Sequence, residues 1–268
     1  FRLLKLQDVF SFKSVSGKSP FESHRISFFT ILMLIEGEMT HEVDFVSYDM
    51  VAGDCLFISK EQVHKFDKRP SYKGYVFNFT EKFMLQHFSL SAYSKISVLS
   101  NRLLNPSLFR DFGDLKFFIG ALENELSQDL GLVKDDVVAS MLTVFLLKAQ
   151  LHTSYDLKSY HGDFAQFYEF QDLVASKFRD SRSAIFYASL LNMPYKQLNK
   201  LCRIFTNSTA KEYINSFIIL EAKRILAATE IPVKEIAYEC GFKESTNFIK
   251  FFKKLTGTSP GDFRGALG

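Results

Sequence analysis

The strongest constraint on this chain is a helical pattern that occurs twice near its C-terminal end. The second copy runs through Ile236–Phe242, then Ser245–Lys254, and closes on Thr256–Pro260. A short helix, a tight turn at Gly241 and a second, basic helix predict a helix-turn-helix, whose second helix fits the major groove of DNA. The pattern therefore predicts a protein that reads a nucleic-acid sequence.

The first copy is found by comparing spacings along the chain. Ala188 corresponds to Ala237 at an offset of 49 residues, whereas four later positions correspond at 50. These later pairs are Leu198 with Phe248, Cys202 with Phe252, Asn207 with Gly257, and Tyr213 with Phe263. The change in offset predicts one residue inserted in the turn of the second copy. Asn and Gly tolerate the left-handed conformation of a helix C-cap, so the third pair predicts two matching helix ends.

Charge is distributed unevenly between the two parts of the chain. Residues 1–163 carry 18 Lys and Arg against 20 Asp and Glu, and residues 164–268 carry 15 against 10. A basic segment joined to a slightly acidic one is typical of a nucleic-acid reader with a separate control domain. The three cysteines are far apart and form no CxxC pair, which favours a reducing cytoplasm.

The N-terminal part predicts strands followed by two helices. Residues 26–80 contain short apolar runs separated by turn signals at Gly37 and at Gly53-Asp54, a pattern typical of a β-barrel or sandwich. Helical spacing follows from Leu115 to Gly131 and from Val133 to about Leu151. We place a linker at residues 152–163 and expect only helices beyond it. No apolar run reaches the roughly 18 residues that a membrane span needs, so no membrane association is expected.

In its repeated helical pattern, the C-terminal part resembles the AraC/XylS family of bacterial transcription regulators. The matching residues are Ala237–Phe242, Phe248, Phe252–Lys254, Gly257, Ser259-Pro260 and Phe263-Arg264. Ile218 departs from the family, which usually has an Arg there that braces the two units. The resemblance implies an α+β protein: a cupin-like sensing and dimerisation domain at residues 1–155, and at residues 164–268 two helix-turn-helix units joined by a long helix.

The N-terminal part resembles the cupin-like sensor domain of that family more loosely. Gly37, Gly53-Asp54 and His64 fit its pattern. Enzymatic cupins hold a metal with His-x-His and Glu, but here only His41 and His64 remain, with no carboxylate at the right spacing. We therefore expect no metal, no cofactor and no catalytic residue, and a protein that is not an enzyme.

The N-terminal half of each second helix is expected to face the base edges of DNA. In the first unit the predicted contact residues are Tyr195, Lys196, Gln197, Asn199 and Lys200. In the second unit they are Lys243, Glu244, Ser245, Thr246, Asn247 and Lys250. Lys253 and Lys254 are expected to meet phosphate, and so are Arg203, Lys223 and Arg224, unless they face solvent. Leu198, Leu201, Phe248 and Phe252 are expected in the core.

The resemblance also implies partners and a location. The chain is predicted to bind double-stranded promoter or operator DNA as a homodimer, to act with RNA polymerase as an activator, and to lie in the bacterial cytoplasm, at the nucleoid when bound to DNA. A small-molecule effector is expected in the barrel, with a lining of Phe29, Ile31, Met33, His41, Phe57, His64 and Phe77. One alternative is a ligand-independent regulator whose barrel serves only dimerisation. Another is a cupin enzyme fused to a DNA reader.

Overall fold

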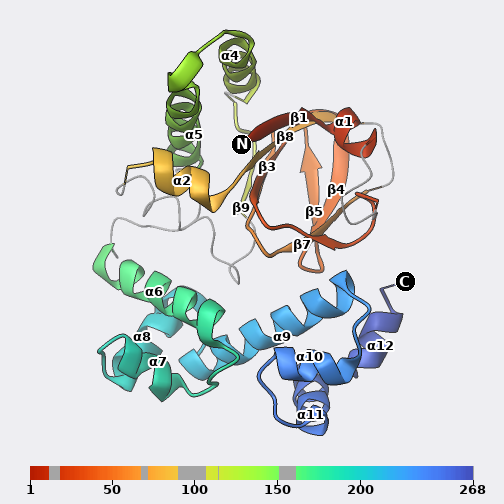
Figure 1. The fold of residues 1–268 in the computed structure, drawn as a ribbon, viewed down its shortest axis with the longest axis vertical. Helices are drawn as coiled ribbons and strands as arrows, with labels where there is room; N and C mark the ends of the chain where they lie inside the picture. The colour runs from red at the N-terminus through yellow and green to blue at the C-terminus, as the bar shows by residue number, and fades with distance from the viewer. Residues whose placement is uncertain (12–18, 68–71, 90–106, 114, 151–160, 268) are drawn as a thin grey trace. The chain divides into compact units, whose positions relative to one another are not determined.

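A computed structural model describes residues 1–11, 19–67, 72–89, 107–113, 115–150 and 161–267 (Figure 1). The chain divides into two compact units, Phe1–Tyr155 and Asp156–Gly268. The first contains antiparallel sheets and helices, and the described part of the second contains only helices. The predicted α+β class is confirmed, and we describe each unit by itself.

Two antiparallel sheets form the centre of the first unit. The five-stranded sheet has the order β1-β8-β3-β6-β9, and the four-stranded sheet has the order β2-β7-β4-β5. The strands of the first sheet are β1 (Arg2–Lys5), β3 (Phe29–Glu36), β6 (Cys55–Ile58), β8 (Lys73–Phe79) and β9 (Ser107–Phe109). Those of the second are β2 (His24–Arg25), β4 (Glu38–Val43), β5 (Val46–Val51) and β7 (Val63–Phe66).

The five-stranded sheet is buried on both faces. One face packs with the four-stranded sheet, and its cluster contains Leu32, Leu34 and Leu56 from β3 and β6. The other face packs with helices and contains Ile31 and Met33, which alternate with the leucines along β3. Because both sides of β3 are covered, its sequence is an apolar run without alternation.

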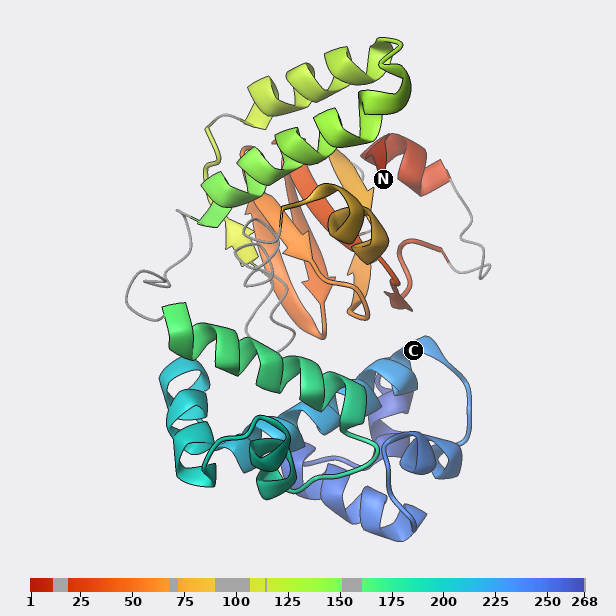
Figure 2. The ribbon, with the colours of Figure 1, turned by 60° about the vertical axis from the view of Figure 1, so that its left-hand side comes forward.

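Besides the strands, the described part of this unit contains four α-helices. They are α1 (Leu6–Ser11), α2 (Glu81–His87), α4 (Leu115–Ser127) and α5 (Lys134–Gln150), with a short 3-10 turn η2 (Gly131–Val133) before α5. Figure 2 shows α4 and α5 lying across the five-stranded sheet, where Leu115, Ile119 and Phe145 join the core. The two helices predicted after the strands are therefore present, and they cover a face of the sheet.

Asp54 connects the turn between β5 and β6 to the segment that follows β9. Its carboxylate is 1% exposed and accepts hydrogen bonds from the backbone N–H groups of Val51 (3.0 Å) and Asp111 (3.1 Å). The guanidinium of Arg110 donates to it at 2.7 Å. A buried carboxylate is tolerated where such donors replace water. The Gly53-Asp54 turn signal thus marks a structural junction.

The second unit is an array of helices around α9 (Ala210–Ala228). The others are α6 (His161–Lys177), α7 (Ala184–Leu190), α8 (Tyr195–Thr206), α10 (Val233–Glu239), α11 (Ser245–Thr256) and α12 (Pro260–Gly265). Helix α9 packs against all six of them. The linker predicted at 152–163 lies outside the described residues as far as residue 160, and the residues after it already belong to α6. Within the described ranges, no helix combines the length and apolar character that crossing a bilayer requires.

Two glycines of the first unit provide a matched test of this packing. A Cβ on Gly74 of β8 would lie 2.2 Å from the carbonyl oxygen of Met33, whereas a Cβ on Gly120 of α4 would meet nothing within 4 Å. We expect Gly74→Ala to lower the free energy of unfolding by about 1–3 kcal/mol, because backbone must move. Gly120→Ala should raise it by about 0.5–1 kcal/mol, because Ala is the better helix former. Urea denaturation measures both, and equal effects would contradict the packing described.

Candidate nucleic-acid interface

The first helix-turn-helix pair of the C-terminal unit consists of α7 and α8. Asn192 turns the chain between them with a left-handed φ of 50°, and the N–H of Met193 donates to the carbonyl of Ala188 at 3.0 Å. Tyr187 and Ala188 are buried against the rest of the unit. The hydroxyl of Tyr187 donates to the carbonyl of Ser181 at 2.8 Å, which anchors the loop before α7.

The second helix-turn-helix pair, α10 and α11, repeats this geometry. Gly241 turns the chain with a φ of 76°, and the N–H of Phe242 donates to the carbonyl of Ala237 at 2.9 Å. The glycine is required for a second reason: a Cβ here would lie 2.4 Å from the carbonyl oxygen of Arg179. The backbone before α7 thus approaches the turn of the second pair so closely that no side chain fits at Gly241.

The helix ends confirm the repeat and locate the insertion. Helices α8 and α11 each have 12 residues, and they begin at Tyr195 and Ser245. Their C-caps, Asn207 and Gly257, are both left-handed, with φ of 54° and 83°. The turns match at an offset of 49 and the second helices at 50, so the extra residue lies between Phe242 and the start of α11.

Both second helices separate an apolar face from a polar one. The core predictions are confirmed, since Leu198, Leu201, Phe248 and Phe252 are all buried. The exposed predicted contacts are Tyr195, Lys196, Gln197 and Lys200 in the first unit, and Lys243, Glu244, Thr246, Asn247, Lys250, Lys253 and Lys254 in the second. Ser245 is half-buried at the start of α11. The predicted set is thus exposed on each second helix or just before it, apart from Asn199 and Ser245, which are half-buried.

Asn199 has a structural contact that sequence spacing did not reveal. It is half-buried, and its amide oxygen accepts a hydrogen bond from the backbone N–H of Ala210 at 3.0 Å. This satisfies one of the unpaired N–H groups at the start of α9. The neighbouring Gln197 is exposed and donates to the side-chain oxygen of Gln166 at 3.3 Å. A base contact by Asn199 stays a prediction.

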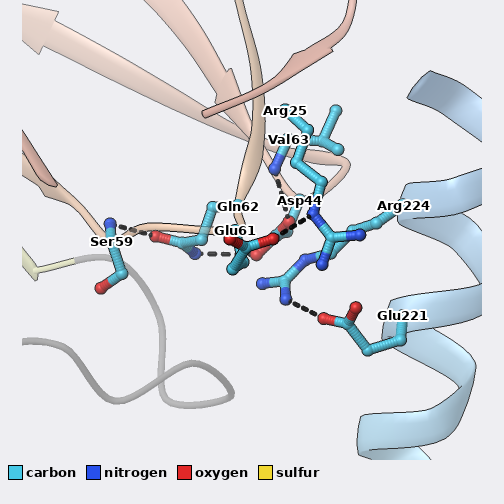
Figure 3. A network of polar contacts seen from close by, with 8 residues as sticks. All are labelled: Arg25, Asp44, Ser59, Glu61, Gln62, Val63, Glu221 and Arg224. Carbon is cyan, nitrogen blue, oxygen red and sulfur yellow. Dashed lines mark hydrogen bonds and ion pairs between the residues drawn. The ribbon is translucent and has the colours of Figure 1, made fainter. Parts of the chain in front are cut away.

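One expected phosphate contact is wrong. Arg224 is fully buried, and its guanidinium donates to the carboxylate of Glu221 one turn earlier on α9 (Figure 3). A buried guanidinium paired in this way faces neither phosphate nor solvent. Lys223 is half-buried, with its Nζ 5.4 Å from the ring centroid of Phe263, whereas Arg203 is exposed on α8. Helical spacing alone did not separate these three cations.

The seven residues predicted to line an effector pocket do not share one site. Five of them are apolar and lie in the cluster between the five-stranded sheet and the helices: Phe29, Ile31, Met33, Phe57 and Phe77. His41 and His64 lie on β4 and β7 of the other sheet. Strand alternation puts His41 on the face of Met39 and Val43, which belongs to the separate cluster between the sheets.

The two histidines form a buried, uncharged group. His41 Nε2 lies 3.0 Å from His64 Nδ1, within hydrogen-bond distance, and the ring of His24 packs on His64 with a centroid separation of 4.4 Å. Burial lowers the pKa of His41 to about 3, and it lowers that of His64 well below its usual value. Among the residues that the structure describes, no group of three His, Cys, Asp or Glu side chains is placed to hold a metal ion.

A polar network next to these histidines fixes the edge of the sheet. The carboxylate of Asp44 accepts from the backbone N–H of Val63 at 3.1 Å and from the side-chain amide of Gln62 at 2.7 Å (Figure 3). The Gln62 oxygen in turn accepts from the N–H of Ser59 at 2.7 Å. Asp44 has a left-handed φ of 49° in the two-residue turn between β4 and β5, and its contacts hold it there.

Comparison with known proteins agrees with the repeated unit. A family model described as a helix-turn-helix domain matches residues 187–266. The chain is 23% identical over 257 residues to the HTH-type transcriptional activator RhaS of Yersinia pestis (strain Pestoides F), covering 93% of this chain and 91% of RhaS. ToxT from Vibrio cholerae O395 has a similar fold, with a TM-score of 0.50 and 17% identity over 92% of each chain. A structure of ToxT bound to (E)-4-(8-methylnaphthalen-1-yl)but-3-enoic acid gives the same TM-score.

The chain is a DNA-binding transcription regulator with an N-terminal antiparallel sheet region and a C-terminal helical region. Its helix-turn-helix region is similar to that of the AraC/XylS family of regulators.

The histidine group predicts acid sensitivity of the first unit. Burial lowers the pKa of His41 from the 6.5 of an unfolded histidine to about 3. Below pH 6.5 the unfolded chain therefore binds more protons, and the free energy of unfolding falls by about 1.4 kcal/mol per pH unit for each such histidine. It is constant with respect to these groups above pH 6.5. Hydrogen exchange of peptides from β3 to β7 in urea, measured between pH 5 and 7, follows this loss.

His41→Gln tests the assignment, because Gln can still donate to His64 but does not titrate. We expect the pH dependence to become shallower by the contribution of one histidine. An unaltered slope in His41→Gln would show that other groups cause the acid sensitivity.

Proposed function

We propose that α8 and α11 each lie in a major groove and that their exposed N-terminal residues contact base edges. The observation that carries this proposal is the repeat of one exposed polar face at a fixed offset, on two helices supported by the same buried helix α9. Asn247 is suited to adenine and Lys250 to guanine, while Glu244 suits cytosine. Lys253 and Lys254, nearer the C-terminal end of α11, are assigned to phosphate.

We also propose that two copies of the chain associate through α4 and α5. These helices cover the sheet with one face, yet several large apolar side chains on them and on the turn between them remain exposed. Phe117 is 80% exposed and Val144 is 57% exposed, and Leu132 and Val133 of the connecting turn are exposed too. Apolar side chains gathered on one pair of helices are typical of an interaction surface. The site on DNA would then consist of two half-sites, one for each copy.

Control by a small molecule through the N-terminal unit is part of the same proposal. It is supported by the likeness of fold to ToxT, which has been solved with a small carboxylic acid bound. Activation of transcription is supported by the name of the relative RhaS. We infer that the chain acts on RNA polymerase at the bacterial nucleoid within the cytoplasm, and that it catalyses no reaction. The alternatives are a regulator whose N-terminal unit binds no ligand and serves only dimerisation, and a cupin enzyme fused to a DNA reader. Binding of an effector without turnover would argue against both.

Asn247→Ala separates base reading from charge attraction. With a duplex selected by the protein from a random pool, we expect a loss of about 1–3 kcal/mol of binding free energy and relaxed discrimination at one base pair. Lys253→Ala should instead weaken selected and scrambled duplexes alike. Fluorescence anisotropy with both duplexes measures the two effects. Equal weakening by both variants on both duplexes would mean that Asn247 does not contact a base.

Substitution of an exposed apolar residue tests the proposed dimer surface. Phe117→Glu and Val144→Glu should shift the chain from dimer to monomer at micromolar concentration, because a charge would be buried without a partner. Leu85→Glu is the matched control, since Leu85 is 62% exposed on α2, outside this surface. Sedimentation equilibrium of the full chain reports the state. A wild-type monomer, or a dimer in all three variants, would exclude α4 and α5 as the interface.

A further inference from the structure

The second unit contains a cleft of about 840 Å³ between its two helix-turn-helix pairs. The wall on one side is the loop Arg179–Ser183 between α6 and α7, and on the other it is the turn Gly241–Lys243. Tyr195, at the start of α8, and Asn247, in the first turn of α11, also line the cleft. It therefore opens where the N-terminal ends of both second helices are displayed.

Two cations are held at this cleft by contacts that fix their position. The guanidinium carbon of Arg182 lies 4.0 Å from the centroid of the Phe242 ring, a cation–π contact that restrains the side chain. The Nζ of Lys211, on the first turn of α9, donates to the carbonyl of Arg182 at 2.7 Å. Partial burial and the charge of Arg182 together lower the pKa of Lys211, so a negative ligand there would be favoured.

The balance of charge around the cleft is positive. Arg179, Arg182, Lys211 and Lys243 line it, against the single acidic residue Asp180. Arg179 forms an ion pair with Glu239 of α10 at 2.7 Å. Arg182, Lys211 and Lys243 thus exceed Asp180 in number even when that pair is set aside. This distribution suits a polyanion rather than a neutral metabolite.

The same contacts hold the two helix-turn-helix pairs at a fixed distance. The ion pair of Arg179 with Glu239, the stacking of Arg182 on Phe242 and the absence of a Cβ at Gly241 all join the loop before α7 to the turn before α11. Ile218 of α9 is buried and apolar, so its side chain adds no polar contact between the two pairs. The contacts of the loop Arg179–Ser183 join them instead.

We propose that this cleft binds the sugar–phosphate backbone of the DNA between the two major grooves, with Arg182 and Lys211 contacting phosphates. The inference rests on the proposed function, since two helices in successive grooves of one duplex face must be separated by a stretch of backbone. A phosphate contact carries no sequence information but fixes the register of the protein on the duplex. The stacked guanidinium is already ordered, so less conformational freedom is lost on binding.

The test uses the full chain with Arg182→Gln and Lys211→Gln, on the selected duplex and on a scrambled one. Each variant should weaken both duplexes by the same factor and leave their affinity ratio unchanged. The slope of log K against log salt concentration should fall by about 0.9 for each lost contact. Lys82→Gln, on the exposed surface of α2 in the first unit, removes one charge elsewhere and should leave the slope unchanged.

Further variants separate a phosphate contact from a merely structural role. Arg182→Lys keeps the charge and should retain most of the slope, whereas Lys211→Gln removes a charge without touching the Phe242 ring. Weaker binding with an unchanged slope in both Gln variants would overturn the proposal. If Asn247→Ala relaxes discrimination while the two Gln variants bind as the wild type does, the cleft assignment fails and base reading by α11 stands. If Asn247→Ala is also silent, the proposed function fails with it.

Discussion

The burial of α9 is the constraint on which the DNA-binding surface depends. Ten of its 19 residues are buried, among them Tyr213, Phe217, Ile218 and Leu226. Removal of each large apolar side chain from water contributes about 1.5–3 kcal/mol. Because α7, α8, α10, α11 and α12 all pack on this helix, their positions are specified by one shared core. A reading helix that moved would have to expose part of that core to water.

The first unit shows a different solution, in which one sheet serves two cores. Strand β3 alternates between Leu32 and Leu34 on the side of the second sheet, and Ile31 and Met33 on the side of α4 and α5. Apolar side chains on one face of each helix are buried against the sheet, whereas others, such as Phe117, stay exposed and available for association. Sheet support and assembly are compatible because a helix has more than one face.

The repeated pattern of the second unit could be predicted because its signals are local. Gly241 at the turn, the C-cap at Gly257 and the buried Phe252 each follow from conformation or spacing within a few residues. Which face of the sheet each residue of β3 occupies could not be predicted, because a strand that is buried on both faces lacks the alternation that would separate Ile31 from its neighbours. Contacts such as Arg182 on Phe242 join residues far apart in sequence, and no pattern along the chain reveals them.

The single residue inserted before α11 makes the two readers unequal. The helices they present also differ in chemistry, with Tyr195 and Gln197 on one and Thr246 and Asn247 on the other. A monomer built from two identical readers related by symmetry could sit on its target in either orientation. On the proposed function, a chain with two unequal readers therefore has a fixed direction along the double helix. Reversal of the stretch of DNA that one chain reads would reverse the orientation of that chain on the duplex.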